Sequence, residues 1–242
     1  MSLLLWGVMP YVAVVMLIAG LVWRARYDKF GWTTHSTQVH ESRLLRIGSP
    51  LFHFGMAFVV LGHVVGLVVP KSWTDAVGVS DHTYHLVAIS TGAVAGVAAI
   101  TGIGILVYRR FKVPAVRRAT LRSDHLMYTF LLGAMILGLA ATVLNSAGAM
   151  GDYNYRDGIS LWFRSLFTFQ PDYALMGQAP VAFQLHILFG FVLFSLIPYS
   201  RLVHIFSAPV KYVFRPYVVY RSRDPQELAN RPQKRGWERV GS

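Results

Sequence analysis

The chain contains no cysteine among its 242 residues. Disulfide bonds, thiolate-bound iron–sulfur clusters, cysteine zinc sites and covalent haem attachment through thioether bonds are therefore excluded within this chain. Acidic residues are also scarce, with 11 Asp and Glu against 23 Lys and Arg. Only 14% of the residues are charged while 54% are hydrophobic, a balance typical of polytopic membrane proteins rather than of soluble domains.

Five apolar segments are long enough to cross a bilayer as helices, because roughly 20 residues span the hydrocarbon. No acidic residue lies within any of them, and the chain has no internal repeat and no low-complexity segment. The first segment is too long for a cleaved signal peptide and no small-residue cleavage site follows it, so we expect it to remain as a spanning helix. The sequence thus predicts an all-α membrane protein with five transmembrane helices, at residues 3–23, 49–69, 84–108, 126–147 and 180–207.

The basic residues are distributed unevenly between the connections. Of the 23 Lys and Arg residues, twenty lie after the first and third apolar segments or at and beyond the end of the fifth. Positive residues mark cytoplasmic connections, so we expect the amino terminus outside and the carboxyl terminus in the cytoplasm. This topology accounts for the net charge of +12 without a nucleic-acid partner. It divides the chain into a transmembrane domain, residues 1–207, and a basic cytoplasmic tail, residues 208–242, which we expect to dock a partner protein.

Two of the apolar segments, 49–69 and 180–207, each carry two histidines. Ionisable residues at membrane depth are rare and are functional candidates by default. Because the two segments cross the membrane in opposite directions, the later histidine of one faces the earlier histidine of the other. The predicted pairs are His63 with His186, near the outer surface, and His53 with His204, near the inner surface.

Two imidazoles from facing helices suit the axial positions of a haem iron. Zinc or copper would need a compact cluster of ligands, and no carboxylate lies at depth to complete one. We therefore expect two b-type haems, although hydrogen bonding between helices is an alternative role for the histidines. A haem propionate needs a cationic partner near a membrane face, and Arg201 is suitably placed for the inner haem. A simple anchor at the membrane surface is the alternative for Arg201.

Other features of the sequence have structural interpretations. The segment 84–108 carries a face of small residues suited to close helix packing, with glycines at 92, 96, 102 and 104. The connection 148–179 is rich in aromatic residues and predicts a short helix on the membrane surface. Pro198 should kink the last segment or let the chain bend. Three histidines outside the apolar segments are not expected to be ligands: His35, His40 and His125.

Three motifs, LFHFGMAFVVLGHVVG, FQLHILFGF and PYSRLVHIFSAPVKY, resemble the gamma subunit of prokaryotic respiratory nitrate reductase, a membrane cytochrome b. The resemblance covers nearly the whole chain in span number, orientation and histidine placement. It implies a five-helix di-haem subunit of the prokaryotic cell membrane, with the four histidines as haem ligands. It also implies that a quinol, menaquinol or ubiquinol, is oxidised near the outer haem. Electrons then pass through the inner haem to an iron–sulfur beta subunit and to a molybdenum alpha subunit that reduces nitrate.

The sequence departs from the family at one place. A lysine implicated at the quinol site of family members has no counterpart here, where residues 80–85 read SDHTYH and the nearby lysine is Lys71. The quinol candidates are therefore Gly62, His63, His82 and His85, although His82 and His85 could also belong to an ordinary solvated loop. Two alternative functions stay open: a related di-haem quinol-oxidising subunit of another reductase, and a haem-free membrane anchor or proton relay. The missing acidic residues and the absence of a repeated half argue against the second.

Overall fold

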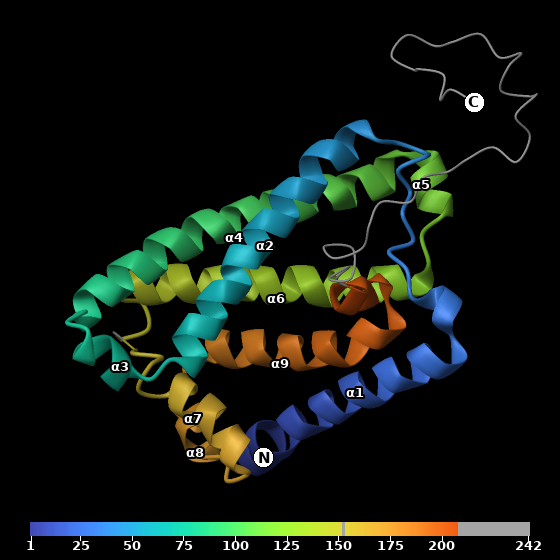
Figure 1. The fold of residues 1–242 in the computed structure, drawn as a ribbon. Helices are drawn as coiled ribbons and strands as arrows, with labels where there is room; N and C mark the ends of the chain where they lie inside the picture. Colours follow the sequence, from blue (N-terminus) through green and yellow to red (C-terminus); the bar gives the residue numbers. More distant parts are fainter. Residues whose placement is uncertain (152, 208–242) are drawn as a thin grey trace, which may run out of the picture. The chain divides into compact units, whose positions relative to one another are not determined.

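The structure is a computed structural model that describes residues 1–151 and 153–207. Within these residues every regular element is a helix, and five helices are long and apolar enough to cross a membrane. The predicted all-α, five-span architecture is confirmed, while the orientation in the membrane stays a prediction. The predicted tail, residues 208–242, lies outside the described residues. The long helices are α1 (Met9–Tyr27, preceded by the π-helix η1, Leu3–Val8), α2 (Arg43–Val68), α4 (Asp81–Lys112), α6 (Arg122–Ser146) and α9 (Val181–Leu196) (Figure 1).

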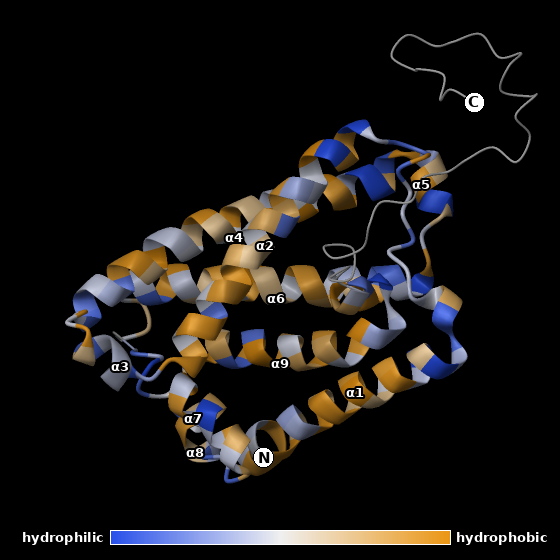
Figure 2. Cartoon of the chain, in the orientation of Figure 1, coloured by the Kyte–Doolittle hydropathy of each residue, from blue (hydrophilic) through white to orange (hydrophobic). Residues whose placement is uncertain are grey.

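Short helices lie in the connections at the two ends of the long helices. The arginine-rich end, which we call the basic end, is formed by residues 24–46, 109–122 and 201–207; α3, α7 and α8 lie at the opposite end (Figure 1). Hydrophobic residues fill the middle of the long helices and hydrophilic residues gather at their ends (Figure 2). The short helices are η2 (Lys29–Gly31), α3 (Lys71–Ala76), α5 (Pro114–Arg118), α7 (Ile159–Ser165), η3 (Leu166–Thr168), α8 (Tyr173–Gly177), η4 (Ile197–Tyr199) and η5 (Arg201–Ser207).

The last predicted span is interrupted near its end. The α-helix stops at Leu196, η4 follows, and Ser200 is extended at φ −125° and ψ 176° before η5 begins. Pro198 supplies the reason, because proline has no N–H and its ring clashes with the preceding turn. The ring also packs on α1, where a Cβ atom on Gly20 would lie 2.7 Å from it. The bend predicted at Pro198 is confirmed, but the segment does not continue as one α-helix to residue 207.

Helices α2 and α4 pack with their backbones in close contact. A Cβ atom on Gly55 would lie 2.6 Å from the backbone nitrogen of Ala99, and one on Gly102 would collide with the backbone nitrogen of Phe52. Small residues allow such an approach between membrane helices. The predicted packing face is therefore confirmed at Gly102, whereas Gly92 and Gly104 have no neighbouring atom within 4 Å of a Cβ position.

Helix α7 closes the end of α2. The last carbonyl groups of a helix lack intrahelical partners; here Ser160 donates to the Gly66 oxygen at 2.8 Å and Arg164 to the Leu67 oxygen at 3.1 Å. Trp162 is 2% exposed and its indole N–H donates to the Trp6 oxygen at 2.8 Å. The short helix predicted in this connection is confirmed, but it packs against α2 and Trp6 rather than lying on a membrane surface alone.

Arg109, at the end of α4, holds the connection that leads into α2. Its guanidinium donates to the Thr37 hydroxyl at 2.7 Å, to the Thr37 oxygen at 2.8 Å and to a Glu41 carboxylate oxygen at 2.5 Å. Burial acts to raise the pKa of the Glu41 carboxyl, but the Leu44 N–H and Arg109 outweigh it and hold that pKa below its ordinary value of 4.5. The charged form of Glu41 is therefore the one that the folded chain favours.

Replacing Gly102 with valine should destabilise the helix pair, because the added carbons meet the backbone of α2. Overpacking of this kind costs about 1–3 kcal/mol. Gly104→Val, two residues away on the same helix, is the matched control because nothing occupies its Cβ space. Thermal unfolding of the purified chain should show a clear drop for Gly102→Val alone; equal behaviour of the two variants would contradict the packing described.

Glu41→Gln should lower stability at neutral pH, with a gap to the wild type that closes on acidification. The carboxyl has a depressed folded-state pKa, so its contribution is present above the unfolded value, 4.5, and is lost as the pH falls through the folded value. Unfolding curves at a series of pH values between neutrality and strong acid measure this gap. A gap that does not change with pH would show that Glu41 does not stabilise through its charge.

Candidate functional site

The four histidines of the apolar segments meet in two facing pairs. The ring centres of His63, on α2, and His186, on α9, lie 5.8 Å apart with their planes at 33°. Those of His53, on α2, and His204, on η5, lie 6.1 Å apart with their planes at 58°. The structure therefore brings together the same pairs that the sequence order predicts, while their role as ligands remains to be tested.

Each of the four imidazoles has its Nδ1 atom against a backbone carbonyl oxygen. Because a carbonyl can only accept, Nδ1 must donate, and the lone pair is left on Nε2. Metal-bound histidines commonly hold their second ring nitrogen in this way, which fixes tautomer and orientation. The acceptors are Ser49 for His53 at 2.7 Å, Val59 for His63 at 2.7 Å, Ala134 for His186 at 2.8 Å and Arg201 for His204 at 2.6 Å.

The spacing within each pair fits one metal ion between two imidazoles. A metal–imidazole bond is about 2 Å long, and a ring centre lies roughly 1 Å behind its nitrogen, so two axial imidazoles put their centres about 6 Å apart. The observed 5.8 Å and 6.1 Å agree with that separation. In the described part of the chain, no three His, Asp or Glu side chains gather into a compact metal site. The donor set thus fits axial ligation of a planar group better than a tetrahedral ion.

The helices that carry the histidines bury few of their own side chains. No residue of α9 is buried, although the helix packs against both α6 and α1. In the most apolar stretches of α2 and of the span Val181–Tyr199, which includes η4, 11% of the residues are buried, against 22% to 28% in the other spans. Gly62, beside His63, and Gly190, one turn after His186, have no atom within 4 Å of a Cβ position. The facing imidazoles and the space beside these two glycines fit the expected haems.

Gly138 on α6 is a site residue that the sequence did not reveal. A Cβ atom there would lie 2.8 Å from Cε1 and 3.0 Å from Nδ1 of His186. Its absence lets the imidazole lie against α6 and reach the oxygen of Ala134, one turn earlier. A glycine in a glycine-containing apolar segment has no distinguishing sequence signal, and only the packing of α9 on α6 identifies it.

The quinol candidates on α4 differ in their surroundings. His82 is exposed, whereas His85 is half-buried and makes edge-to-face contacts with Tyr84 at 5.9 Å and Tyr155 at 5.8 Å between ring centres. Tyr155 also lies beside α2, with its hydroxyl 3.5 Å from the Cβ position of Gly66. His85 and Tyr155 therefore lie about one helical turn along α2 from His63. No sequence signal identifies Tyr155, because a tyrosine in a loop belongs to no motif.

Charged residues pack around the aromatic cluster of Tyr84, His85 and Tyr155, which lies at the end of the long helices away from the basic end. Arg156 is 2% exposed; it stacks over the Tyr84 ring at 3.8 Å and donates to Asp81 at 3.3 Å. Lys71 forms an ion pair with the same carboxylate, and this hydrogen bond raises the pKa of Lys71. Burial raises the pKa of the Tyr155 hydroxyl, as does its hydrogen bonding with Tyr84, so Tyr155 stays protonated and can donate a hydrogen bond at physiological pH.

Arg201, the predicted partner of a haem propionate, is engaged with groups of the protein. Its Nε and one terminal nitrogen pair with the two oxygens of Asp124 at 2.7 Å and 2.5 Å. The other terminal nitrogen donates to the backbone oxygens of Thr34 at 3.2 Å and His35 at 3.4 Å. The side chain is 12% exposed, so it is more than a surface anchor. Contact with a propionate stays a prediction.

Comparison with known proteins places the chain among membrane subunits of nitrate reductases. The nitrate reductase gamma subunit family matches residues 2–223. The chain is 45% identical to the nitrate reductase gamma chain of Bacillus subtilis, over 91% of this chain and 98% of that one. It is 31% identical to the respiratory nitrate reductase 1 gamma chain of Escherichia coli, over 92% and 98%. It is also 50% identical to the nitrate reductase-like protein NarX of Mycobacterium tuberculosis over 98% of its length, but spans only 36% of that relative.

Gly138→Ala should disturb the His63–His186 pair and leave the other pair intact, because the added methyl group meets the His186 ring. We expect a lower haem content and an altered visible spectrum for one haem of two. Gly92→Ala is the control, since no atom lies within 4 Å of its Cβ position. Haem quantification per chain and low-temperature spectra of the membranes measure the effect. A Gly138→Ala chain with the full wild-type spectrum would show that Gly138 is not part of the site.

Proposed function

The chain belongs to the nitrate reductase gamma subunit family, and from this premise we propose that it oxidises a quinol and passes the electrons through two b haems toward nitrate. It is a multi-pass bacterial membrane protein and a membrane subunit of a nitrate reductase. The observation that carries the proposal is the presence of two pairs of facing histidines, with ring centres 5.8 Å apart in one pair and 6.1 Å apart in the other. In all four histidines a backbone carbonyl oxygen holds Nδ1.

The four histidines would hold the two haems, which supply one-electron transfer when bound. His63 and His186 would hold one haem, at the end away from the basic end. His53 and His204 would hold the other haem, near the basic end. The carbonyl oxygens hold each Nδ1, so that Nε2 would be the nitrogen that binds the iron. Gly62, beside His63, and Gly190, one turn after His186, would leave room for the flat group beside the imidazoles.

Quinol oxidation releases two protons and two electrons, and protein groups must receive the protons. The His85 and Tyr155 cluster, with Tyr155 beside Gly66 about one helical turn along α2 from His63, offers a proton acceptor beside a hydrogen-bond donor. His85 would accept one quinol proton, Tyr155, which stays protonated, would donate a hydrogen bond to the other quinol oxygen, and the proton of that oxygen would pass to water at the outer surface. His82 is exposed, so it is a weaker candidate for a quinol contact than His85.

The direction of electron flow follows from the predicted orientation. Protons would leave at the outer surface, and electrons would pass to the basic end and on to an iron–sulfur beta subunit and a molybdenum alpha subunit in the cytoplasm. Moving one electron inward against a potential of 100 mV, negative inside, costs about 2.3 kcal/mol, so the reaction conserves energy. The predicted tail, residues 208–242, would contribute to docking those subunits.

Single alanine substitutions of the histidines should each remove one haem of two. His63→Ala and His186→Ala should lose the same haem, and His53→Ala and His204→Ala the other, because each iron loses one axial ligand. Exposed His40 is the control, and His40→Ala should retain both. Dithionite-reduced minus oxidised spectra, with haem quantified per chain, report the result. A wild-type chain without haem would leave only a membrane anchor or proton relay, and reoxidation by another acceptor but not by nitrate would indicate a different reductase.

His85→Ala should slow quinol oxidation while both haems remain. Loss of one hydrogen-bonding and proton-accepting group is expected to lower kcat/KM by at least about tenfold. Tyr155→Phe should act in the same direction, and His82→Ala, three residues away on the same helix, is the matched control. Rates are measured with a reduced soluble quinol in the assembled complex, and spectra verify the haem content. If His82→Ala slows the reaction and His85→Ala does not, the quinol binds elsewhere on α4.

A further inference from the structure

His204, which pairs with His53 near the basic end, does not lie on the helix that carries His186. Between them α9 ends at Leu196 and the chain is extended at Ser200. A histidine on a continuous helix takes its position from the helix, but His204 follows a break and takes its position from whatever fixes η5. The contacts of Arg201, the first residue of η5, therefore decide where the imidazole of His204 lies.

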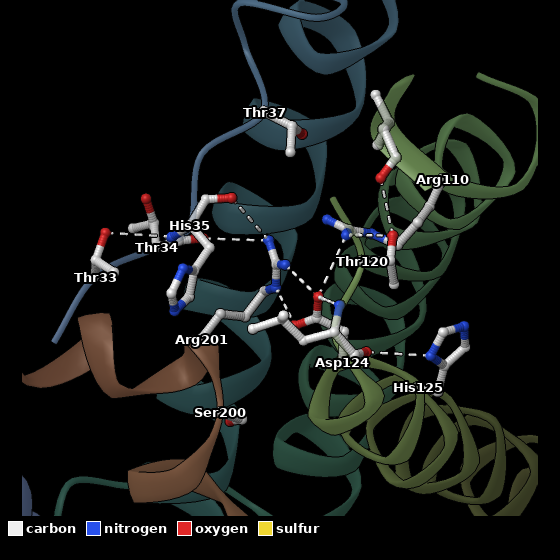
Figure 3. Close-up of polar contacts among 12 residues, drawn as sticks. Thr33, Thr34, His35, Thr37, Arg110, Thr120, Asp124, His125, Ser200 and Arg201 are labelled. Atoms are coloured by element: carbon white, nitrogen blue, oxygen red, sulfur yellow. Dashed lines mark hydrogen bonds and ion pairs between the residues drawn. The ribbon is translucent and has the colours of Figure 1, made fainter. Parts of the chain in front are cut away.

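A buried carboxylate on α6 fixes that residue. Asp124 is 1% exposed, and both of its oxygens pair with the guanidinium of Arg201, at 2.7 Å and 2.5 Å (Figure 3). One of these oxygens also faces Arg110 of α4 at 3.4 Å and accepts the backbone N–H of Leu121 at 3.0 Å. A two-pronged pair of a carboxylate with a guanidinium sets both distance and direction. Asp124 thereby ties η5 to the start of α6 and the end of α4.

The same residue, Arg201, orients the imidazole directly. Its backbone oxygen accepts the Nδ1 proton of His204 at 2.6 Å. On its other side, the guanidinium holds the backbone oxygens of Thr34 and His35, and His35 has φ +46°, a strained value for a residue other than glycine. The network therefore runs from Asp124 to Arg201 (Figure 3), and from the backbone oxygen of Arg201 to His204.

We propose that Asp124 is a positioning residue for His204, holding the His53–His204 pair in ligating geometry through Arg201; this rests on the proposed haem function. Stability does not by itself explain the ion pairs of Asp124 with Arg110 and Arg201, because buried ion pairs are often no more stabilising than apolar residues of the same size. A two-pronged pair does confer a defined geometry. Among the four histidines, His204 needs this defined geometry, because it follows the break in the helix.

The test uses the assembled complex in membranes, with the two haems resolved by optical redox titration. Asp124→Asn removes the charge that offsets Arg110 and Arg201, so electron uptake nearby becomes easier. The midpoint potential of the haem that is lost in His204→Ala should rise, and that of the other haem should stay unchanged. Arg201→Lys keeps the charge but not the two-pronged contact, and should shift the spectrum of the same haem or reduce its content. Asp124→Glu, which keeps the carboxylate, should restore part of the wild-type behaviour.

Asp28→Asn is the matched control. Asp28 also pairs with an arginine at the basic end, Arg24 at 3.5 Å, but neither residue contacts a histidine of the pairs. This variant should leave both haems as in the wild type. Unchanged potentials and spectra in both Asp124→Asn and Arg201→Lys, or equal changes in both haems, would overturn the proposal. If Asp124→Asn does not accumulate, Arg201→Lys decides. A wild-type complex without two haems would instead refute the proposed function, which separates the two failures.

Discussion

Hydrocarbon offers no hydrogen-bond partner to a polar group, and the arrangement of this chain depends on meeting that constraint inside the protein. Each of the four paired histidines, three in the spans and His204 on η5, has a backbone carbonyl oxygen as partner for one ring nitrogen. The same requirement explains why α7 donates side-chain hydrogen bonds to the last carbonyl groups of α2. In each imidazole the Nδ1 contact leaves the lone pair on Nε2, and Nε2 is the atom that would bind a haem iron.

Close packing elsewhere makes that geometry possible. Helix α2 lies backbone to backbone on α4 through Gly55 and Gly102, which leaves its histidine-bearing side to face α9. Helix α9 rests on α6 in turn, where Gly138 admits the imidazole of His186. The two helices that carry the histidines are thus supported from outside, α2 by α4 and α9 by α6, and can enclose a ligand between them. Glycine contributes here by removing atoms rather than by flexibility.

The arginines of the basic end serve two purposes. The excess of Lys and Arg there predicts the orientation, a statistical property of connections. In the structure, however, Arg109, Arg110 and Arg201 are largely buried and bind specific partners: Thr37 and Glu41, Asp124, and the carbonyl groups of Thr34 and His35. Asp124 lies in the first turn of α6, where a negative charge is favourable, but its two cationic partners come from segments 14 and 77 residues away. No local pattern connects them.

The order of residues along the chain was enough to predict the five spans and the pairing of His63 with His186 and His53 with His204. Hydrophobic length and antiparallel crossing suffice for that, since they depend only on the order of residues along each helix. How these histidines are held depends on the fold: the break at Pro198 that separates His204 from α9, the space that the missing Cβ of Gly138 leaves for His186, and the contact of His85 with Tyr155 while His82 is exposed. These features arise where side chains from distant segments meet, and a contact between distant segments has no periodicity within either of them.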